Sequence, residues 1–373
     1  MTPAARPQSA LPYALSLLLL PVTAAAAWAG GWALLLVPVT GWYLFSAIDL
    51  VAGRDMANAD PQTAEADLFW HRLLTGAWVP LQAILVFGAI AWTARSDRLS
   101  GAETLGLFFG IGVVTGTVGL NYGHELLHQR NRVERWLGDL LLGMVFYGHF
   151  RSEHLLVHHR HVGTPRDAVT ARYNEGFHRF FLRVLPQCLI SAFRAEAAQL
   201  DRRGRRWWHR DNPFWRYAAI QSAHAALALA LGGVAGLGLL LFQALVAVWQ
   251  LELVNYVEHY GLTRRHLGGG RYERVMPHHS WNAAHRTTNW LLINLQRHSD
   301  HHLRPDRRFP LLQHRPEAEA PQLPYPYPVM TTAALIPPLW RRIMNPRVRR
   351  WRRRHYPDIT DWSAYGGRAA RAA

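Results

Sequence analysis

Residues 101–128 read GAETLGLFFGIGVVTGTVGLNYGHELLH. The run from 101 to 122 is almost wholly apolar and is about as long as a bilayer-spanning helix must be. Ser100 and Glu103 form a predicted capping box, because each side chain can satisfy a free amide at the helix start. HELLH at 124–128 follows at once, and its two histidines stand one helical turn apart on one face. The stretch predicts a membrane helix that carries metal ligands out of the bilayer.

Apolar segments of similar length recur on both sides of this stretch, at 11–29, 32–51, 73–94, 216–232 and 236–254. With 101–122 they predict an all-α, polytopic membrane protein with six transmembrane helices, four within 1–122 and two within 216–254. The first segment could also be a signal peptide, but a second one follows after only Gly30 and Gly31, which favours a membrane hairpin. The apolar run at 136–148 is short, and we expect it to be re-entrant or buried at the interface.

The chain carries a net charge of +16, from 41 basic and 25 acidic residues, and every basic residue is arginine. Excess arginine is typical of the cytoplasmic segments of membrane proteins, and this explanation is favoured over nucleic-acid binding. With six spans, both termini and the regions 123–215 and 255–355 lie in the cytoplasm, where they form a helical cap. Residues 335–354 resemble an amphipathic membrane-surface element, and 356–373 are expected to be disordered.

Cys188 is the only cysteine of the chain. An internal disulfide and any cysteine-based zinc or iron–sulfur site are therefore excluded. If the chain needs a rubredoxin-type electron carrier, that carrier must be a separate protein.

Four histidine clusters lie at or near the ends of the apolar segments: HELLH at 124–128, EHLLVHH at 153–159, NYVEHYG at 255–261 and LQRHSDHH at 295–302. They offer nine candidate ligands: His124, His128, His154, His158, His159, His259, His298, His301 and His302. Nine imidazoles are too many for one tetrahedral zinc ion but suit two iron ions. HELLH alone also fits a membrane zinc protease with Glu125 as general base, which leaves the other seven histidines without a role.

Helical geometry divides the clusters further. His154 and His158 are expected to share one face, whereas His159 is turned about 100° away and would serve a second metal unless the helix distorts. His298, His301 and His302 are expected on one side of a helix. His259 ends the last span with no histidine beside it.

Six carboxylates stand close enough in sequence to orient the ligand histidines: Glu125, Glu153, Asp167, Glu252, Glu258 and Asp300. A metal-bound imidazole donates its other ring N–H to such a group, which fixes the orientation of the ring. We expect these residues mainly in that role, although one could bind metal directly. Glu252 could equally make a structural hydrogen bond.

The sequence resembles the membrane-bound, histidine-rich non-haem di-iron family of desaturases and hydroxylases, and most closely its alkane 1-monooxygenases. The resemblance rests on HELLH, on EHLLVHH followed by TPRDA, on NYVEHYGL, on GRYERVMPHHSWN and on LQRHSDHH. Three departures affect substrate range and packing rather than the histidines. Val157 stands where the family usually has glycine, Arg166 where it has an acidic residue, and Ala283 with Ala284 where it has Ser-Asn.

The resemblance implies hydroxylation of the terminal methyl group of a linear alkane, with O2 as co-substrate and two iron ions as cofactor. It also implies electrons from an NAD(P)H-dependent rubredoxin reductase through rubredoxin, and a place in the bacterial inner membrane. A related enzyme acting on an aryl methyl or fatty acyl group is the main alternative. Trp42 or Tyr43 could limit the length of a substrate tunnel, although interfacial anchoring is the favoured role for both.

Overall fold

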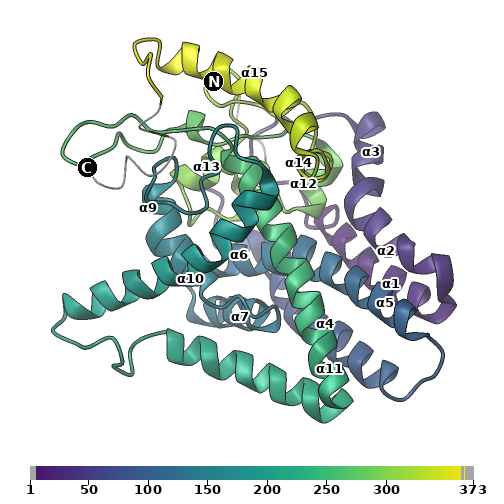
Figure 1. Cartoon of the computed structure of the whole chain (residues 1–373). Helices are drawn as coiled ribbons and strands as arrows, with labels where there is room; N and C mark the ends of the chain where they lie inside the picture. Colours follow the sequence, from purple (N-terminus) through teal and green to yellow (C-terminus); the bar gives the residue numbers. More distant parts are fainter. Residues whose placement is uncertain (1–5, 363–364, 366–373) are drawn as a thin grey trace.

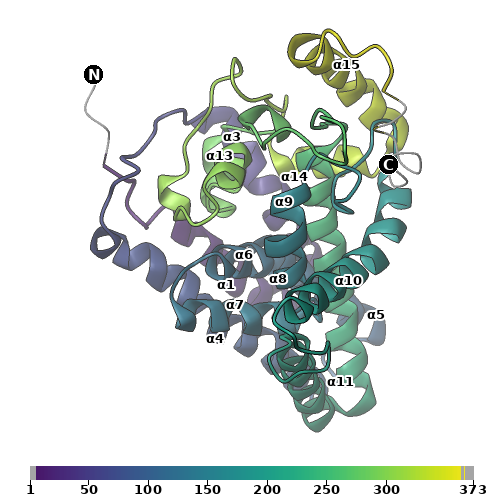
Figure 2. The same ribbon diagram turned by 90° about the vertical axis from the view of Figure 1, so that its left-hand side faces the viewer.

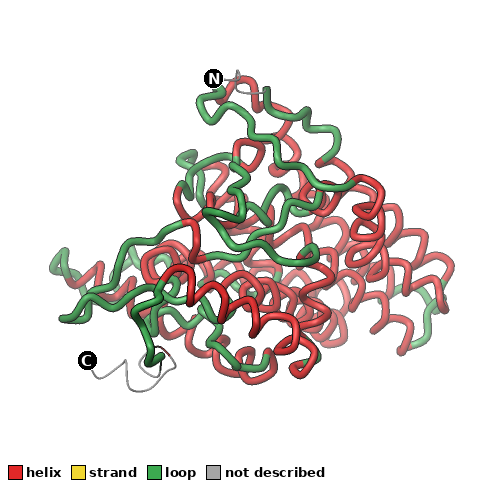
Figure 3. The backbone as a smooth tube through the Cα atoms, turned by 90° about the horizontal axis from the view of Figure 1, so that it is seen from above, coloured by secondary structure: helices red, strands yellow, loops and turns green. Residues whose placement is uncertain are grey.

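The computed structural model describes residues 6–362 and 365. Helices and loops make up the described residues, which contain isolated β-bridges but no strand (Figure 3). The prediction of an all-α protein is therefore confirmed. The prediction of disorder over 356–373 falls largely outside the described residues, but Tyr356 is buried against the helix that precedes it.

Four helical segments are long and apolar enough to cross a membrane: Gly31–Ala52, Glu65–Thr93, Gly101–Leu127 and Phe214–His259. Tyr13–Ala29 is a shorter apolar helix, and Phe214–His259 (α11) loses helical geometry at Gly232 and Gly233. Six predicted segments become four candidates because the first is a shorter helix and the last two form one helix, α11, across this bend. The count of six spans and the cytoplasmic position of the cap remain predictions.

The spanning segments are built from shorter helices. Gly31–Ala52 contains η2 (Gly31–Leu35), α2 (Leu36–Val39), η3 (Thr40–Leu44) and α3 (Phe45–Ala52), and it follows η1 (Tyr13–Leu18) and α1 (Leu19–Ala29). Glu65–Thr93 contains η4 (Glu65–Leu68) and α4 (Phe69–Thr93). Gly101–Leu127 contains α5 (Gly101–Val114), the π-helical η5 (Thr115–Leu120) and α6 (Asn121–Leu127).

Close packing joins α5 to α11. A Cβ atom placed on Gly112 would lie 2.6 Å from the Cβ of Val246 and 2.8 Å from the carbonyl oxygen of Gln243. Glycine at this position lets the two helix backbones approach, as small residues do between membrane helices. The predicted capping box is also confirmed, because Glu103 N–H donates to Ser100 Oγ and Ser100 N–H donates to Glu103 Oε2.

The remaining helices surround this bundle, some toward one end and some along its side (Figure 1). They are α7 (Arg132–Met144), α8 (Phe150–Glu153), η6 (His154–His158), α9 (His159–His161), α10 (Phe177–Asp201), η7 (Pro277–His279), α12 (Arg286–Leu291), α13 (His298–Leu303), η8 (Phe309–Leu311), α14 (Tyr327–Ala334) and α15 (Pro337–His355). The short apolar run predicted at 136–148 corresponds to most of α7, which packs beside α6 and α4.

The amphipathic helix α15 uses its apolar face inside the protein. Trp340, Met344, Val348 and Trp351 recur at helical spacing and are buried. They belong to one hydrophobic cluster with residues of α11, and the ring of Trp340 lies 5.2 Å from that of Tyr256. The sequence pattern correctly indicates an amphipathic helix, but the expected membrane-surface role is wrong for its apolar side. An apolar stripe does not reveal whether protein or lipid covers it.

Candidate metal centre

Five histidines from four elements direct their Nε2 atoms toward one point. They are His124, His128, His154, His159 and His301. The Nε2 atom of His154 lies 2.9 Å from that of His124, 2.9 Å from that of His128 and 3.0 Å from that of His159. Ligand nitrogens at about 2.1 Å from a metal and at right angles to each other stand about 3 Å apart. We call these residues the first histidine group.

The other four predicted histidines converge beside it. His158, His259, His298 and His302 form the second histidine group, and all four are buried. The Nε2 atom of His298 lies 3.1 Å from that of His259 and 3.0 Å from that of His302. The ring centroids of His159 and His302 are 4.7 Å apart, so the two groups adjoin. The structure thus brings together all nine histidines that the sequence singled out, including His259.

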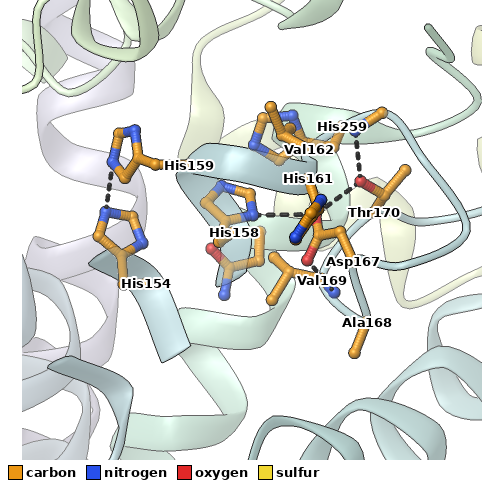
Figure 4. Close-up of polar contacts among 12 residues, drawn as sticks. His154, His158, His159, His161, Val162, Asp167, Ala168, Val169, Thr170 and His259 are labelled. Atoms are coloured by element: carbon orange, nitrogen blue, oxygen red, sulfur yellow. Dashed lines mark hydrogen bonds and ion pairs between the residues drawn. The ribbon is translucent and has the colours of Figure 1, made fainter. Parts of the chain in front are cut away.

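A π-helix decides which group each histidine of EHLLVHH joins. Over His154–His158 the backbone is π-helical, and the N–H of His159 donates to the carbonyl of His154 five residues earlier. This spacing aligns His154 with His159 and turns His158 the other way (Figure 4). The expectation that His154 and His158 share a face is therefore wrong, and the distortion considered as an alternative is what occurs. π-Helical segments are frequent at functional sites.

The cluster on α13 is also divided. His298 and His302 are four residues apart and join the second group, whereas His301 joins the first. The three rings do lie on one side of α13, as expected, with centroids 4.6 to 5.7 Å apart, but they serve two different groups. Because α13 lies between the two groups, neighbouring positions on it can face different groups.

The second group has the protonation that metal binding requires. His158 Nδ1 lies 3.0 Å from Asp167 Oδ2, and a carboxylate can only accept, so the ring proton is on Nδ1. His158 Nε2 then carries a lone pair, and it is buried with no hydrogen-bond partner among the described residues. His259 Nδ1 likewise donates to the carbonyl of His279, at 3.4 Å. An orphaned, inward-facing lone pair among imidazoles fits a metal ion.

Burial keeps the clustered imidazoles neutral. It lowers the pKa of the six cluster histidines outside the spanning segments, and repulsion from neighbouring histidines lowers it further. They are His128, His154, His159, His298, His301 and His302. A neutral imidazole offers the lone pair that a metal needs.

Two of the six predicted carboxylates lie against cluster histidines. Asp167 accepts from His158 and also from Thr170 Oγ1, at 2.7 Å, and Glu258 Oε1 lies 3.2 Å from His298 Nδ1. Arg166, which departs from the family pattern, is exposed and leaves this contact of Asp167 intact. Asp167 therefore orients the ring of His158 through a hydrogen bond, whereas Glu258 lies near His298 without a hydrogen bond to it.

The other four carboxylates have different surroundings. Glu125 accepts from Gln129 and Phe309 N–H, Glu252 accepts from Tyr147 and Asn255, and Asp300 pairs with Arg307 and Arg315. Glu252 therefore makes the structural hydrogen bonds that were its alternative role. Glu153 is fully buried with both carboxylate oxygens unpartnered among the described residues. Burial, with repulsion from Asp167 and Glu252, raises the pKa of Glu153 well above its usual value.

Comparison with known proteins agrees with this geometry. The family model for fatty acid desaturases matches residues 102–334. The chain belongs to the fatty acid desaturase family. It is 38% identical over 326 residues to alkane 1-monooxygenase 2 of Pseudomonas aeruginosa, covering 85% of each chain. It is 37% identical to alkane 1-monooxygenase 2 of Alcanivorax borkumensis, over 82% of each chain, and 30% identical to the hydroxylase component of xylene/toluene monooxygenase of Pseudomonas putida, over 83% of this chain and 81% of that protein.

Membership of this family confirms the resemblance drawn from the motifs and argues against the zinc protease. A protease of the HExxH type needs its glutamate beside the metal-bound water. Glu125 is instead bonded to Gln129 and to the backbone of Phe309, and five histidines rather than two surround the point that HELLH faces. The chain is an enzyme of the monooxygenase class.

A mostly apolar cavity with about 60 Å³ of space for water-sized molecules opens onto both histidine groups. His124, His154 and His298 line it, and so does Trp42. On one wall Gly116, Thr117, Leu120 and His124 follow each other along η5 and α6, a rise of about 12 Å. On the facing wall Gln250, Val254 and Glu258 follow α11. The cavity therefore runs between helices toward the histidines.

A third cluster, which the sequence interpretation left unassigned, contains Glu273, His278 and His279. Met276 N–H donates to His279 Nδ1 at 2.9 Å, so the ring proton of His279 is on Nε2. That N–H faces the hydroxyl oxygen of Tyr356 at 2.7 Å, and Tyr356 donates to Glu273. The cluster is a hydrogen-bonded network, and its only sequence signal was the HH of the PHHSWN stretch.

Proposed function

We propose that the chain hydroxylates the terminal methyl group of linear alkanes. The balanced reaction is RH + O2 + 2e⁻ + 2H⁺ → ROH + H2O. The observation that carries the proposal is the narrow apolar cavity that ends on two adjoining histidine groups. The similarity to alkane 1-monooxygenases supports it as well.

The nine histidines are proposed to hold two iron ions, one in each histidine group. When bound, the two ions supply the activation of O2 and the oxidation of the C–H bond. His158 and His259 are held for this by hydrogen bonds to Asp167 and to the His279 carbonyl. Their orientation is thus fixed before any ion binds, as outer contacts of metal ligands generally provide.

The cavity walls position the substrate. Leu120, Leu251, Val254 and Leu295 offer an apolar surface that holds an extended hydrocarbon chain and excludes water. Because the walls lie between helices, only a narrow chain can enter end-on, and its terminal methyl group then meets the histidines. This arrangement favours the end of the chain over its middle.

Trp42 is proposed to limit the length of chain that fits. Its Nε1 donates to Gln250 Oε1 at 2.7 Å, and Gln250 Nε2 donates to Thr117 Oγ1 at 2.6 Å. These bonds satisfy the buried polar groups within the cavity wall and fix the indole in place. Tyr43 does not line the cavity, and its hydroxyl lies 3.0 Å from Thr332 Oγ1.

The proposed setting is the bacterial inner membrane, crossed six times, with both termini and the histidines on the cytoplasmic side. Arginine-rich segments around the histidines support this orientation. The proposed electron donor is rubredoxin, reduced by an NAD(P)H-dependent reductase. A separate donor is needed because Cys188, the only cysteine, is buried in the hydrophobic core.

An aryl methyl group is the second candidate substrate, because the xylene/toluene monooxygenase hydroxylase component is a relative. Product analysis by mass spectrometry, with octane, dodecane, hexadecane and toluene under reducing conditions, separates the candidates. Primary alkanols are the expected products. Benzyl alcohol without alkanols would replace the alkane proposal, and purified protein with zinc and no iron would remove the di-iron site.

A further inference from the structure

Helix α15 presents two opposite faces. One carries the buried apolar stripe described above. The other carries exposed arginines that lie on one side of the helix: Arg342, Arg349, Arg350, Arg353 and Arg354. We call this set the arginine face. We propose that it is the docking surface for the small acidic protein that delivers electrons to the enzyme, an inference that rests on the proposed hydroxylase function.

The local charge is strongly positive. Pro337–His355 contains no aspartate or glutamate. Of the nearby carboxylates, Asp358 pairs with Arg265 and Glu319 pairs with Arg315, and Glu317 shares a pocket with Arg350 and Arg354. A dense surface of one sign attracts a partner of the opposite sign and speeds its association.

The position of α15 favours a soluble partner over lipid. Figures 1 and 2, which differ by a rotation about the vertical axis, both place α15 at the top of the molecule and the bend of α11 at the bottom. The apolar stripe of α15 is buried in the protein, and Leu339 is the one large apolar side chain of the helix that is exposed, so no continuous apolar face is left to insert into a bilayer. Most of the fully exposed residues of α15 are arginines.

A short chain of contacts leads from this helix to the second histidine group. Tyr356 directly follows α15, and its hydroxyl oxygen lies 2.7 Å from His279 Nε2. The carbonyl of His279 accepts from His259 Nδ1. Trp351 on α15 also donates to the carbonyl of His278, at 2.7 Å. Hydrogen bonds through Tyr356 and His279 therefore connect the end of α15, where the donor would dock, with His259 of the second histidine group.

The electron requirement of the reaction indicates which kind of protein docks on the arginine face. Each turnover consumes two electrons, and the single buried cysteine cannot build an iron–sulfur carrier in this chain. The electrons come from another protein, which gives up one electron on each of two visits and is itself oxidised once each time. The positive surface selects a donor with an acidic face.

A second basic surface is the rival docking site. A groove between η6 and α10 is lined by Arg160, Arg166, Arg194 and Arg202. It runs beside the backbone of the histidine-bearing π-helix, since Leu156 and Val157 also line it. The groove also has a bonded contact with the second group, because Arg166 and Ala168 flank Asp167, which accepts from His158 Nδ1. The arginine face is preferred because α15 carries five exposed arginines and no acidic residue.

The test compares two triple charge reversals in full-length, metal-free protein in nanodiscs, with a purified acidic rubredoxin as the probe. One variant carries Arg342→Glu, Arg350→Glu and Arg353→Glu, chosen because these exposed side chains make no hydrogen bond among the described contacts. The matched control carries Arg166→Glu, Arg194→Glu and Arg202→Glu, all exposed residues of the groove. We expect the first to raise the Kd by at least about tenfold and to flatten its salt dependence, and the control to change it by less than about threefold.

An equal or larger loss in the groove control, or an unchanged Kd in the α15 variant, would overturn the proposal. The corresponding glutamine variants make the same comparison if the reversals fold poorly. Iron-loaded protein driven by a small chemical reductant tests the hydroxylase function separately, because that reductant needs no docking. The α15 variant should retain this activity, and absence of product in the unchanged protein would refute the proposed function instead.

Discussion

The two histidine groups and the cluster of Glu273, His278 and His279 look alike by proximity, since each brings candidate ligand atoms within 4.8 Å of one another. They differ in what the second ring nitrogen does. His158 donates its Nδ1 proton outward to Asp167 and keeps a lone pair directed inward, whereas His279 accepts Met276 N–H at Nδ1 and directs a proton inward. Clustering alone does not make a metal site; the outer contact of each ring decides which nitrogen can bind.

The strongest test of this contrast removes one imidazole from the second histidine group and one from the cluster of Glu273, His278 and His279. His158→Ala should abolish hydroxylation and lower the bound iron by at least half, because a ligand whose lone pair has no other partner is lost. His278→Ala should leave the iron content near that of the unchanged protein. Metal analysis by plasma mass spectrometry after identical purification makes the comparison. Loss of iron from both variants would mean that the third cluster also holds metal.

The second test changes the hydrogen bond that His158 Nδ1–H donates to Asp167. Asp167→Asn keeps the size of the side chain but offers an amide where His158 Nδ1–H needs an acceptor, which favours the wrong tautomer of the ring. We expect the affinity for iron to fall by about 10- to 100-fold. Competition with a chelator measures the affinity, and Asp306→Asn, an exposed carboxylate paired with Arg130, is the matched control. An unchanged affinity would show that Asp167 does not set the tautomer.

The spanning segments and the clusters were predictable because their signals are local. Hydropathy marks 101–122, the Ser100 and Glu103 pair marks its start, and a spacing of four aligns His124 with His128. The partner of His159 was not predictable, because a π-helix over His154–His158 depends on packing and leaves no mark in the spacing of residues. The contacts of Glu252 also depend on a residue far along the chain, Tyr147.

In the cluster of Glu273, His278 and His279, the substitution Tyr356→Phe removes the hydroxyl group that lies between His279 and Glu273. Bound iron should not change, because neither His279 ring nitrogen faces a histidine group. Stability should fall by about 1 to 3 kcal/mol, since a buried N–H and a carboxylate both lose a partner. Chemical unfolding monitored by tryptophan fluorescence measures the change. A loss of iron with unchanged stability would contradict the assignment of this cluster as a structural network.

The smallest expected effect is the pH dependence of the same network. Burial acts to raise the pKa of Glu273, but hydrogen bonds from His279, from Arg265 N–H and from Tyr356 outweigh it and lower the pKa from 4.5 to about 2. A carboxylate with a depressed pKa stabilises the fold fully above its unfolded pKa and loses that contribution as the pH falls through its folded pKa. The difference in unfolding free energy between the unchanged protein and Glu273→Gln should therefore be constant above about pH 5 and shrink between about pH 4.5 and 2. Unfolding curves at about pH 6, 4 and 3 measure it. If this difference in unfolding free energy stays constant down to pH 3, the network does not hold Glu273 ionised. That result would also argue against the inference that the ring proton of His279 is on Nε2.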